Sequence, residues 1–126
     1  MIAPAINTNT GFKKFVKFWL PILLWMGVIF YFSSLPGKDI PSLFPLQDVI
    51  FHITVYTLLA YLFSRALKNT YPKLTPARLV FLVVIFGIIY GLSDEFHQSF
   101  VAGRDASAFD LFIDTVGSFM GGIFYR

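Results

Sequence analysis

The stretch LVFLVVIFGIIYGLSDEFHQSF, residues 79–100, decides the fold because it joins a long apolar run to a cluster of ionisable side chains. A bilayer requires roughly 17 to 25 residues of helix, and this stretch with the residues just before it predicts a spanning helix at about 77–98. Thr75 can cap that helix and Pro76 suits its first turn. An apolar helix that ends in acids is therefore the first feature to explain.

The composition of the whole chain is typical of a membrane protein. Of its 126 residues, 56% are hydrophobic and only 13% are charged, and the mean hydropathy is +0.70. An ordinary soluble domain is roughly 45–50% apolar and about 25% charged. The length fits a single domain over residues 1–126. Cysteine is absent, which excludes disulfides, thiolate catalysis and cysteine-based zinc sites.

Three more apolar stretches predict helices at about 15–33, 48–67 and 107–125. The first resembles a signal peptide because lysines precede it, but its apolar run is longer than the roughly 7 to 15 residues that are usual there. It therefore reads as an uncleaved anchor. Proline-containing segments separate the helices. The prediction is an all-α, polytopic membrane protein, a bundle of four transmembrane helices in which the fourth is the shortest and most polar.

Basic residues set the expected orientation, since Lys and Arg are enriched in cytoplasmic loops. Eight of the ten basic residues fall on one side of this topology. They are Lys13, Lys14, Lys17, Arg65, Lys68, Lys73, Arg78 and Arg126. Both termini are therefore expected on the cytoplasmic side. The basic character then reflects membrane topology, and no nucleic-acid partner is expected.

The acids show the opposite distribution, and all seven fall at the outer ends of the predicted helices or in the outer loops. They are Asp39, Asp48, Asp94, Glu95, Asp105, Asp110 and Asp114, and both histidines, His52 and His97, accompany them. Acids contribute little to the orientation rule itself. Topology alone does not explain why they gather there.

Helical phase places these residues on shared faces. The faces are Gly87, Gly91, Asp94 and Gln98 on the third helix, with Glu95 at the edge; Asp110, Asp114, Gly117 and Gly121 on the fourth; and Asp48, His52 and Tyr56 on the second. Small residues four apart let helices approach closely in lipid. We therefore expect the three faces to meet in one pocket, roofed by the loop that carries Arg104.

Some of these residues have plainer explanations. Asp48 and Asp110 can be first-turn acids favoured by the helix dipole, His97 falls off the polar face and can be interfacial, and Arg104 is either a loop cation or the counter-charge of the acids. Asp114 differs, because it lies deep enough in its helix to be inside the membrane. An ionisable residue there is a functional or partnered group by default.

The order of short motifs resembles the VanZ-like family of small bacterial membrane proteins. The motifs are S-S-x-P, D-x-x-x-H-x-x-x-Y, G-x-x-x-E-x-x-Q, G-R-x-x-S-x-x-D and G-x-x-x-G. Here they comprise Ser33, Ser34 and Pro36; Asp48, His52 and Tyr56; Gly91, Glu95 and Gln98; Gly103, Arg104, Ser107 and Asp110; and Gly117 and Gly121. The resemblance runs over residues 33–122. Val49 and Asp114 depart from the family's usual Lys and Asn.

The resemblance implies a setting in the cell envelope. The family's name comes from a protein associated with resistance to the glycopeptide teicoplanin. It implies a multi-pass protein of the bacterial cytoplasmic membrane, and the distribution of Lys and Arg predicts that its N-terminus is inside. The lipid bilayer is then the first expected partner, and the family supplies no settled reaction.

The residues allow a chemical hypothesis. Crowded, partly desolvated carboxylates cannot all stay charged at low cost, so a divalent metal ion is a candidate cofactor, since carboxylate oxygens and imidazole are plausible ligands. The candidate metal ligands are Asp94 and Asp114, with Asp48, His52, Glu95 and Asp110 as further candidates. The candidate catalytic residues are Glu95, His52, Asp48 and Asp110, and the candidate substrate-binding residues are Arg104, Gln98, Tyr56 and Ser107.

Three functions fit these residues. The first is an enzyme acting at the outer leaflet on a phosphorylated lipid or a lipid-linked cell-wall precursor, with Glu95 or His52 as general acid or base. The second is a non-catalytic protein that binds an envelope ligand or an antibiotic in the same acidic pocket. A coupled transporter ranks last, because four short helices leave little room for two inverted repeats.

Overall fold

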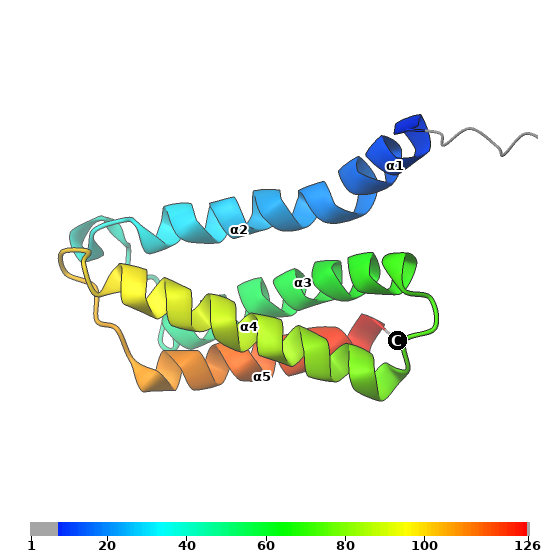
Figure 1. Cartoon of the computed structure of the whole chain (residues 1–126). Coiled ribbons are helices and arrows are strands. Elements are labelled where there is room, and N and C mark those ends of the chain that lie inside the picture. The colour runs from blue at the N-terminus through cyan, green and yellow to red at the C-terminus, as the bar shows by residue number, and fades with distance from the viewer. Residues whose placement is uncertain (1–7, 126) are drawn as a thin grey trace, which may run out of the picture.

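The computed structural model describes residues 8–125, and over that part of the chain it contains helices and no strand (Figure 1). The elements are α1 (Thr8–Lys14), the π-helical turn η1 (Phe15–Trp19), α2 (Leu20–Ser33), the short 3₁₀ turn η2 (Gly37–Asp39), α3 (Gln47–Thr70), α4 (Pro76–Gln98) and α5 (Ala108–Tyr125). The all-α prediction is therefore confirmed. Arg126, counted above among the basic residues, lies outside the described residues.

The first helix begins earlier than predicted. The elements α1, η1 and α2 follow one another without a break, so Lys13, Lys14 and Lys17 lie within the helical rod instead of ahead of it. Long basic side chains can extend from a helix toward polar headgroups, so the helix can continue through these three lysines. The other three helices begin and end within a few residues of their expected bounds. Thr75 caps α4 as expected, because its Oγ1 accepts a hydrogen bond from the Arg78 backbone N–H.

Three helical segments are long and apolar enough to cross a membrane, namely Asn9–Ser33, Gln47–Thr70 and Pro76–Gln98. Helix α5 is not among them; it carries Asp110 and Asp114 within its 18 residues. The described part of the chain thus has the features of a membrane protein with three membrane-compatible helices. That α5 crosses the bilayer, and that the termini lie on the cytoplasmic side, stay predictions.

Helices α3 and α5 pack closely because glycine removes side chains from their contact. A Cβ atom built on Gly117 would lie 2.9 Å from the Ile53 carbonyl oxygen, and one built on Gly121 would lie 2.6 Å from the Ala60 Cβ. Carbon atoms normally stay about 3.5 to 4.0 Å apart. The G-x-x-x-G face of α5 is therefore a helix contact, and it is directed at α3.

The glycine face of α4 meets α5 in the same way. A Cβ on Gly87 would overlap the Ser118 side chain, and one on Gly91 would lie 3.3 Å from Asp114 Oδ2. The bare backbone at Gly91 is thus what lets the Asp114 carboxylate lie against α4. The packing of the bundle and the position of a candidate site residue have the same cause.

Helix α2 runs along one side of the α3, α4 and α5 bundle (Figure 1). Only 11% of the most apolar window of the continuous helical segment Asn9–Ser33, which contains α2, is buried, so most of that surface is left for lipid. Two polar side chains attach it to the bundle. Trp25 Nε1 donates to the Val55 carbonyl at 2.9 Å, and the Tyr90 hydroxyl donates to the Met26 carbonyl at 2.7 Å.

The two loops at one end of the bundle are joined to each other. We call this the acidic end; it consists of loops 34–46 and 99–107 and the helix ends beside them. The Gly37 N–H donates to the Ala102 carbonyl at 2.9 Å, and a Cβ on Gly37 would overlap the Gly103 backbone. Gly103 itself has a φ of 74°, in the region that favours glycine. These contacts hold both loops in one place.

Candidate functional site

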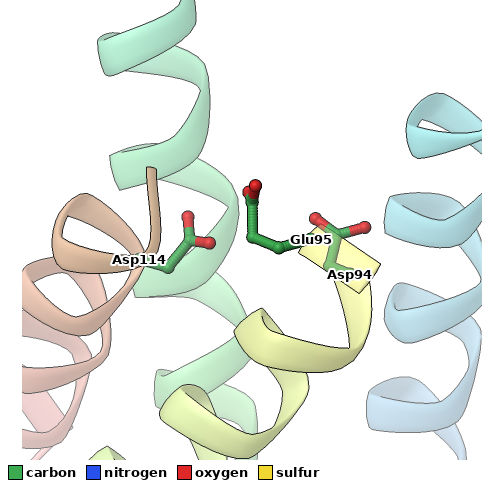
Figure 2. A group of neighbouring side chains, drawn as sticks. All are labelled: Asp94, Glu95 and Asp114. Atoms are coloured by element: carbon green, nitrogen blue, oxygen red, sulfur yellow. The ribbon is translucent and has the colours of Figure 1, made fainter. Parts of the chain in front are cut away.

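Three acids from two helices meet in the interior of the acidic end. Asp94 and Glu95 come from the last turns of α4 and Asp114 from the second turn of α5. Each offers a carboxylate oxygen, and these oxygens all lie within 4.8 Å of one another. In Figure 2 the Glu95 carboxylate lies between those of Asp94 and Asp114. The residues are 7%, 9% and 0% exposed. We call these three residues the buried acid cluster.

A histidine from a third helix is bonded to this cluster. His52, on α3, places Nδ1 2.7 Å from Asp114 Oδ1, and both side chains are buried. An ionised carboxylate can only accept, so Nδ1 carries the proton and donates. The other ring nitrogen, Nε2, is then the basic one in the neutral ring. Asp114 therefore fixes both the orientation and the tautomer of His52.

The loop before α5 holds Glu95 in position. The Ser107 backbone N–H donates to Glu95 Oε2 at 2.6 Å. The Ser107 hydroxyl accepts from the backbone N–H groups of Phe109, at 3.1 Å, and Asp110, at 3.3 Å. It thereby caps the start of α5, as serine commonly does. In this arrangement the Ser107 hydroxyl, expected to bind substrate, is occupied by backbone donors.

A cleft of about 650 Å³ opens at the acidic end, a size typical of sites for small molecules. The predicted residues that line it are Asp48, His52, Gln98, Arg104, Ser107 and Asp110. A much smaller void, of about 10 Å³, lies beside it and is about the smallest space that holds one water molecule. The predicted residues around the void are His52, Tyr56, Asp94, Gln98 and Arg104. His52, Gln98 and Arg104 thus stand between the cleft and the void.

The remaining candidates divide by depth. Asp48 is exposed and Asp110 half-buried at the mouth of the cleft, so neither belongs to the buried acid cluster. Tyr56 is fully buried and lines only the void, so its hydroxyl lies below the cleft. His97 lines neither space; its ring stacks on Phe30 with centroids 4.3 Å apart.

Arg104 has a structural task as well as a place in the cleft. Its Nη1 donates to the Phe32 carbonyl at 3.0 Å and to the Leu35 carbonyl at 3.1 Å, at the end of α2. It therefore ties the loop before α5 to the end of α2. One nitrogen of the planar group is used in this way, while the residue still borders both the cleft and the void.

Two residues of the site were not singled out by sequence reasoning. Gln47 orders the wall of the cleft, since its Nε2 donates to the Pro41 carbonyl and its Oε1 accepts from the Leu43 N–H, both at 2.7 Å. Ser33 is buried and lines the void beside Asp94. Ser33 had a signal, because it begins the S-S-x-P motif; Gln47 had only its position just before a helix.

No curated protein and no solved structure matches the chain. The model of the family described as VanZ/LLP1 matches residues 18–126, which include α2 to α5 and every residue of the site described above. Because the match extends over most of the sequence, this chain belongs to the VanZ/LLP1 family.

Proposed function

We propose that this protein is a membrane enzyme that cleaves a phosphate ester of a phosphorylated lipid or of a lipid-linked cell-wall precursor. The observation that carries the proposal is the hydrogen bond between His52 Nδ1 and Asp114 Oδ1, 2.7 Å long, made by a histidine that also lines the cleft. A carboxylate that orients a histidine and leaves its other nitrogen basic is a recurring arrangement for general base catalysis.

The groups around His52 suit phosphoryl chemistry. Water in the cleft would attack phosphorus while His52 Nε2 accepts its proton, and the leaving oxygen would take its proton from solvent at the mouth of the cleft, beside Asp48 and Asp110. The free part of the Arg104 guanidinium and the Gln98 amide would contact the phosphate oxygens. Glu95, with one oxygen held by Ser107, is the other candidate for the proton transfer.

The surroundings of the cleft suit a lipid substrate. Large apolar side chains beside it are exposed, among them Phe44, Leu46 and Phe109. The lipid tails would then stay in the bilayer while the phosphate enters the cleft. In this proposal the acidic end faces outward, the N-terminus is inside and the membrane is the bacterial cytoplasmic membrane. A link to glycopeptide resistance would follow if the substrate is a cell-wall precursor.

The test compares two histidines of the same protein. Purified His52→Gln and His97→Gln variants would be given phosphatidate, a polyprenyl phosphate and a polyprenyl diphosphate in detergent, and released phosphate measured. Loss of a general base lowers rates by about 10² to 10⁴-fold, so we expect that loss in His52→Gln alone. If folded His52→Gln is as active as the unchanged protein, His52 is not the general base. If the unchanged protein releases no phosphate from any of these lipids, the proposed reaction is wrong.

A second function, the binding of an amine-bearing envelope ligand or antibiotic, is favoured by the charges at the mouth. Asp48, Asp105 and Asp110 line it with Arg104 as the counter-charge, and complementary charge promotes encounter with a cationic ligand. Saturable binding that persists in His52→Gln, with no product formed, would establish this alternative. Turnover that depends on His52 would exclude it as the main role.

A further inference from the structure

We infer that the buried acid cluster binds one divalent cation through oxygen atoms of Asp94, Glu95 and Asp114. This inference concerns a bound ion and does not rest on the reaction proposed above. An acidic cluster alone would not justify it, since exposed acids often gather without an ion. Here the acids are buried, and the polar atoms around them point to a missing positive partner.

The first observation concerns the second oxygen of each anchored carboxylate. Glu95 Oε2 accepts from the Ser107 N–H, whereas Glu95 Oε1 is buried and has no hydrogen-bond partner. Asp114 Oδ1 accepts from His52, whereas Asp114 Oδ2 is buried and has no partner. Two residues from two helices thus show the same pattern. Carboxylates that bind metals are themselves commonly held by hydrogen bonds through their outer atoms.

The second observation concerns the space beside the cluster. The Tyr56 side chain is fully buried and its hydroxyl has no partner, although it lines the water-sized void together with Asp94 and His52. Buried hydroxyls without a partner are rare. A water molecule bound to a cation at the cluster would supply that partner.

The negative charge of the buried acid cluster also favours a bound cation. The cluster carries three formal negative charges when ionised, and the side chain that is bonded to it is the imidazole of His52, with no lysine or arginine among the described residues in an ion pair with it. Neighbouring like charges in a buried site disfavour one another unless an opposite charge accompanies them. A divalent ion would compensate two of the three charges. The His52 N–H, which donates to Asp114 Oδ1, would help to stabilise the third.

The ligands select the class of ion. Three carboxylate oxygens, with no thiolate available and with His52 Nδ1 already bonded, suit Mg²⁺, Mn²⁺ or Ca²⁺. Oxygens on opposite sides of Ca²⁺ are about 4.6 to 5.2 Å apart, and those across Mg²⁺ about 4.0 to 4.2 Å. The cluster oxygens lie within 4.8 Å of one another, so no pair of them is farther apart than two oxygens bound to one Ca²⁺ can be. Water molecules would supply the remaining ligands.

The test measures ion binding in the purified full-length protein without any substrate. After treatment with chelator, Mn²⁺ would be titrated and free Mn²⁺ followed by electron paramagnetic resonance, with Mg²⁺ and Ca²⁺ as competitors. We expect one saturable site per chain with a Kd below about 1 mM. Glu95→Gln and Asp94→Asn should weaken binding at least about tenfold, while Asp39→Asn, in the loop outside the cluster, should not change it.

The folding of each variant is checked independently, so that loss of ion binding caused by misfolding is not mistaken for the loss of a metal ligand. Each variant would be compared by size-exclusion chromatography and by its thermal unfolding without metal, and the unchanged protein should unfold at a higher temperature when Mn²⁺ is present. No saturable binding to the unchanged protein, or full binding to folded Glu95→Gln, would overturn the inference. Phosphate release that needs His52, together with no saturable ion binding, would overturn it and leave the proposed reaction standing, whereas ion binding without turnover would do the reverse.

Discussion

Alanine substitution at two adjacent glycines of α5 should have opposite effects on the stability of the protein. In Gly121→Ala the new Cβ would lie 2.6 Å from the Ala60 Cβ and 2.9 Å from the Tyr61 nitrogen. Carbon atoms at contact are about 3.5 to 4.0 Å apart, so α3 and α5 must separate by about 1 Å. In Gly122→Ala the nearest atom, Val80 Cα, is 3.5 Å away, which is an ordinary contact and needs no movement.

The magnitudes follow from these distances. Overpacking costs roughly 1 to 3 kcal/mol, and the better helix propensity of alanine returns at most about 1 kcal/mol. Gly121→Ala should therefore lower the free energy of unfolding by about 1 to 2 kcal/mol, or the melting temperature by roughly 4 to 8 °C. Gly122→Ala keeps the propensity gain without the clash, so its melting temperature should stay equal or rise slightly.

The assay is thermal unfolding in detergent, followed by circular dichroism at helical wavelengths. Gly27→Ala in α2 is a further control, because no atom lies within 4 Å of its new Cβ. If Gly121→Ala melts at the same temperature as Gly122→Ala, the close contact between α3 and α5 described above is wrong. The G-x-x-x-G face would then have to be turned elsewhere.

Three further outcomes are expected. Arg104→Gln should lower the melting temperature, because it removes hydrogen bonds to the Phe32 carbonyl of α2 and to the Leu35 carbonyl just after it, each worth about 1 kcal/mol; an unchanged melting curve would contradict this role. Ser107→Ala should cost about 1 kcal/mol through the lost cap yet retain activity, since its backbone N–H still holds Glu95; lost activity with full stability would instead indicate substrate contact. Because the chain has no cysteine, single cysteines at Ser42 and Lys73 can be labelled from outside whole cells, and only Ser42→Cys should react.

The helices and the faces they present were largely predictable from the sequence. Spacing alone placed Gly117 and Gly121 on one face of α5 and Gly87 and Gly91 on one face of α4, and both faces are helix contacts. Helical phase predicts these contact faces because the close approach of helices in lipid depends on small side chains at regular intervals. It does not state which neighbour a face meets, so the direction of α5 toward α3 came only from the structure.

The depth of each site residue in the bundle, which depends on its position along the helix axis, is harder to predict from the sequence. Asp48 and His52 share a face, but they are four residues apart, or about 6 Å along the axis. This separation leaves Asp48 exposed at the mouth and His52 buried beside Asp114. The bond between His52 and Asp114 depends on how α3 and α5 are staggered, which no single helix encodes.

Backbone partners could not be read from the sequence at all. Glu95 is held by the N–H of Ser107, and every residue except proline has such a donor. The sequence motif draws attention to the Ser107 side chain, whereas the contact with Glu95 is made by the Ser107 main chain. The first helix likewise begins before its apolar run, because Lys13, Lys14 and Lys17 lie within the helix and do not mark its edge.

The sharing of the site among α3, α4 and α5 has a consequence for biosynthesis. Helix α5 carries Asp114 and is less suited to cross a membrane alone than the three helices before it. It leaves the ribosome after α3 and α4, whose backbone and small side chains already offer the close contacts that Gly117, Gly121 and Gly122 make. In the predicted four-helix topology, α5 would enter the bilayer by associating with that hairpin, so that bringing Asp114 to His52 would be the same event that secures the helix in the membrane.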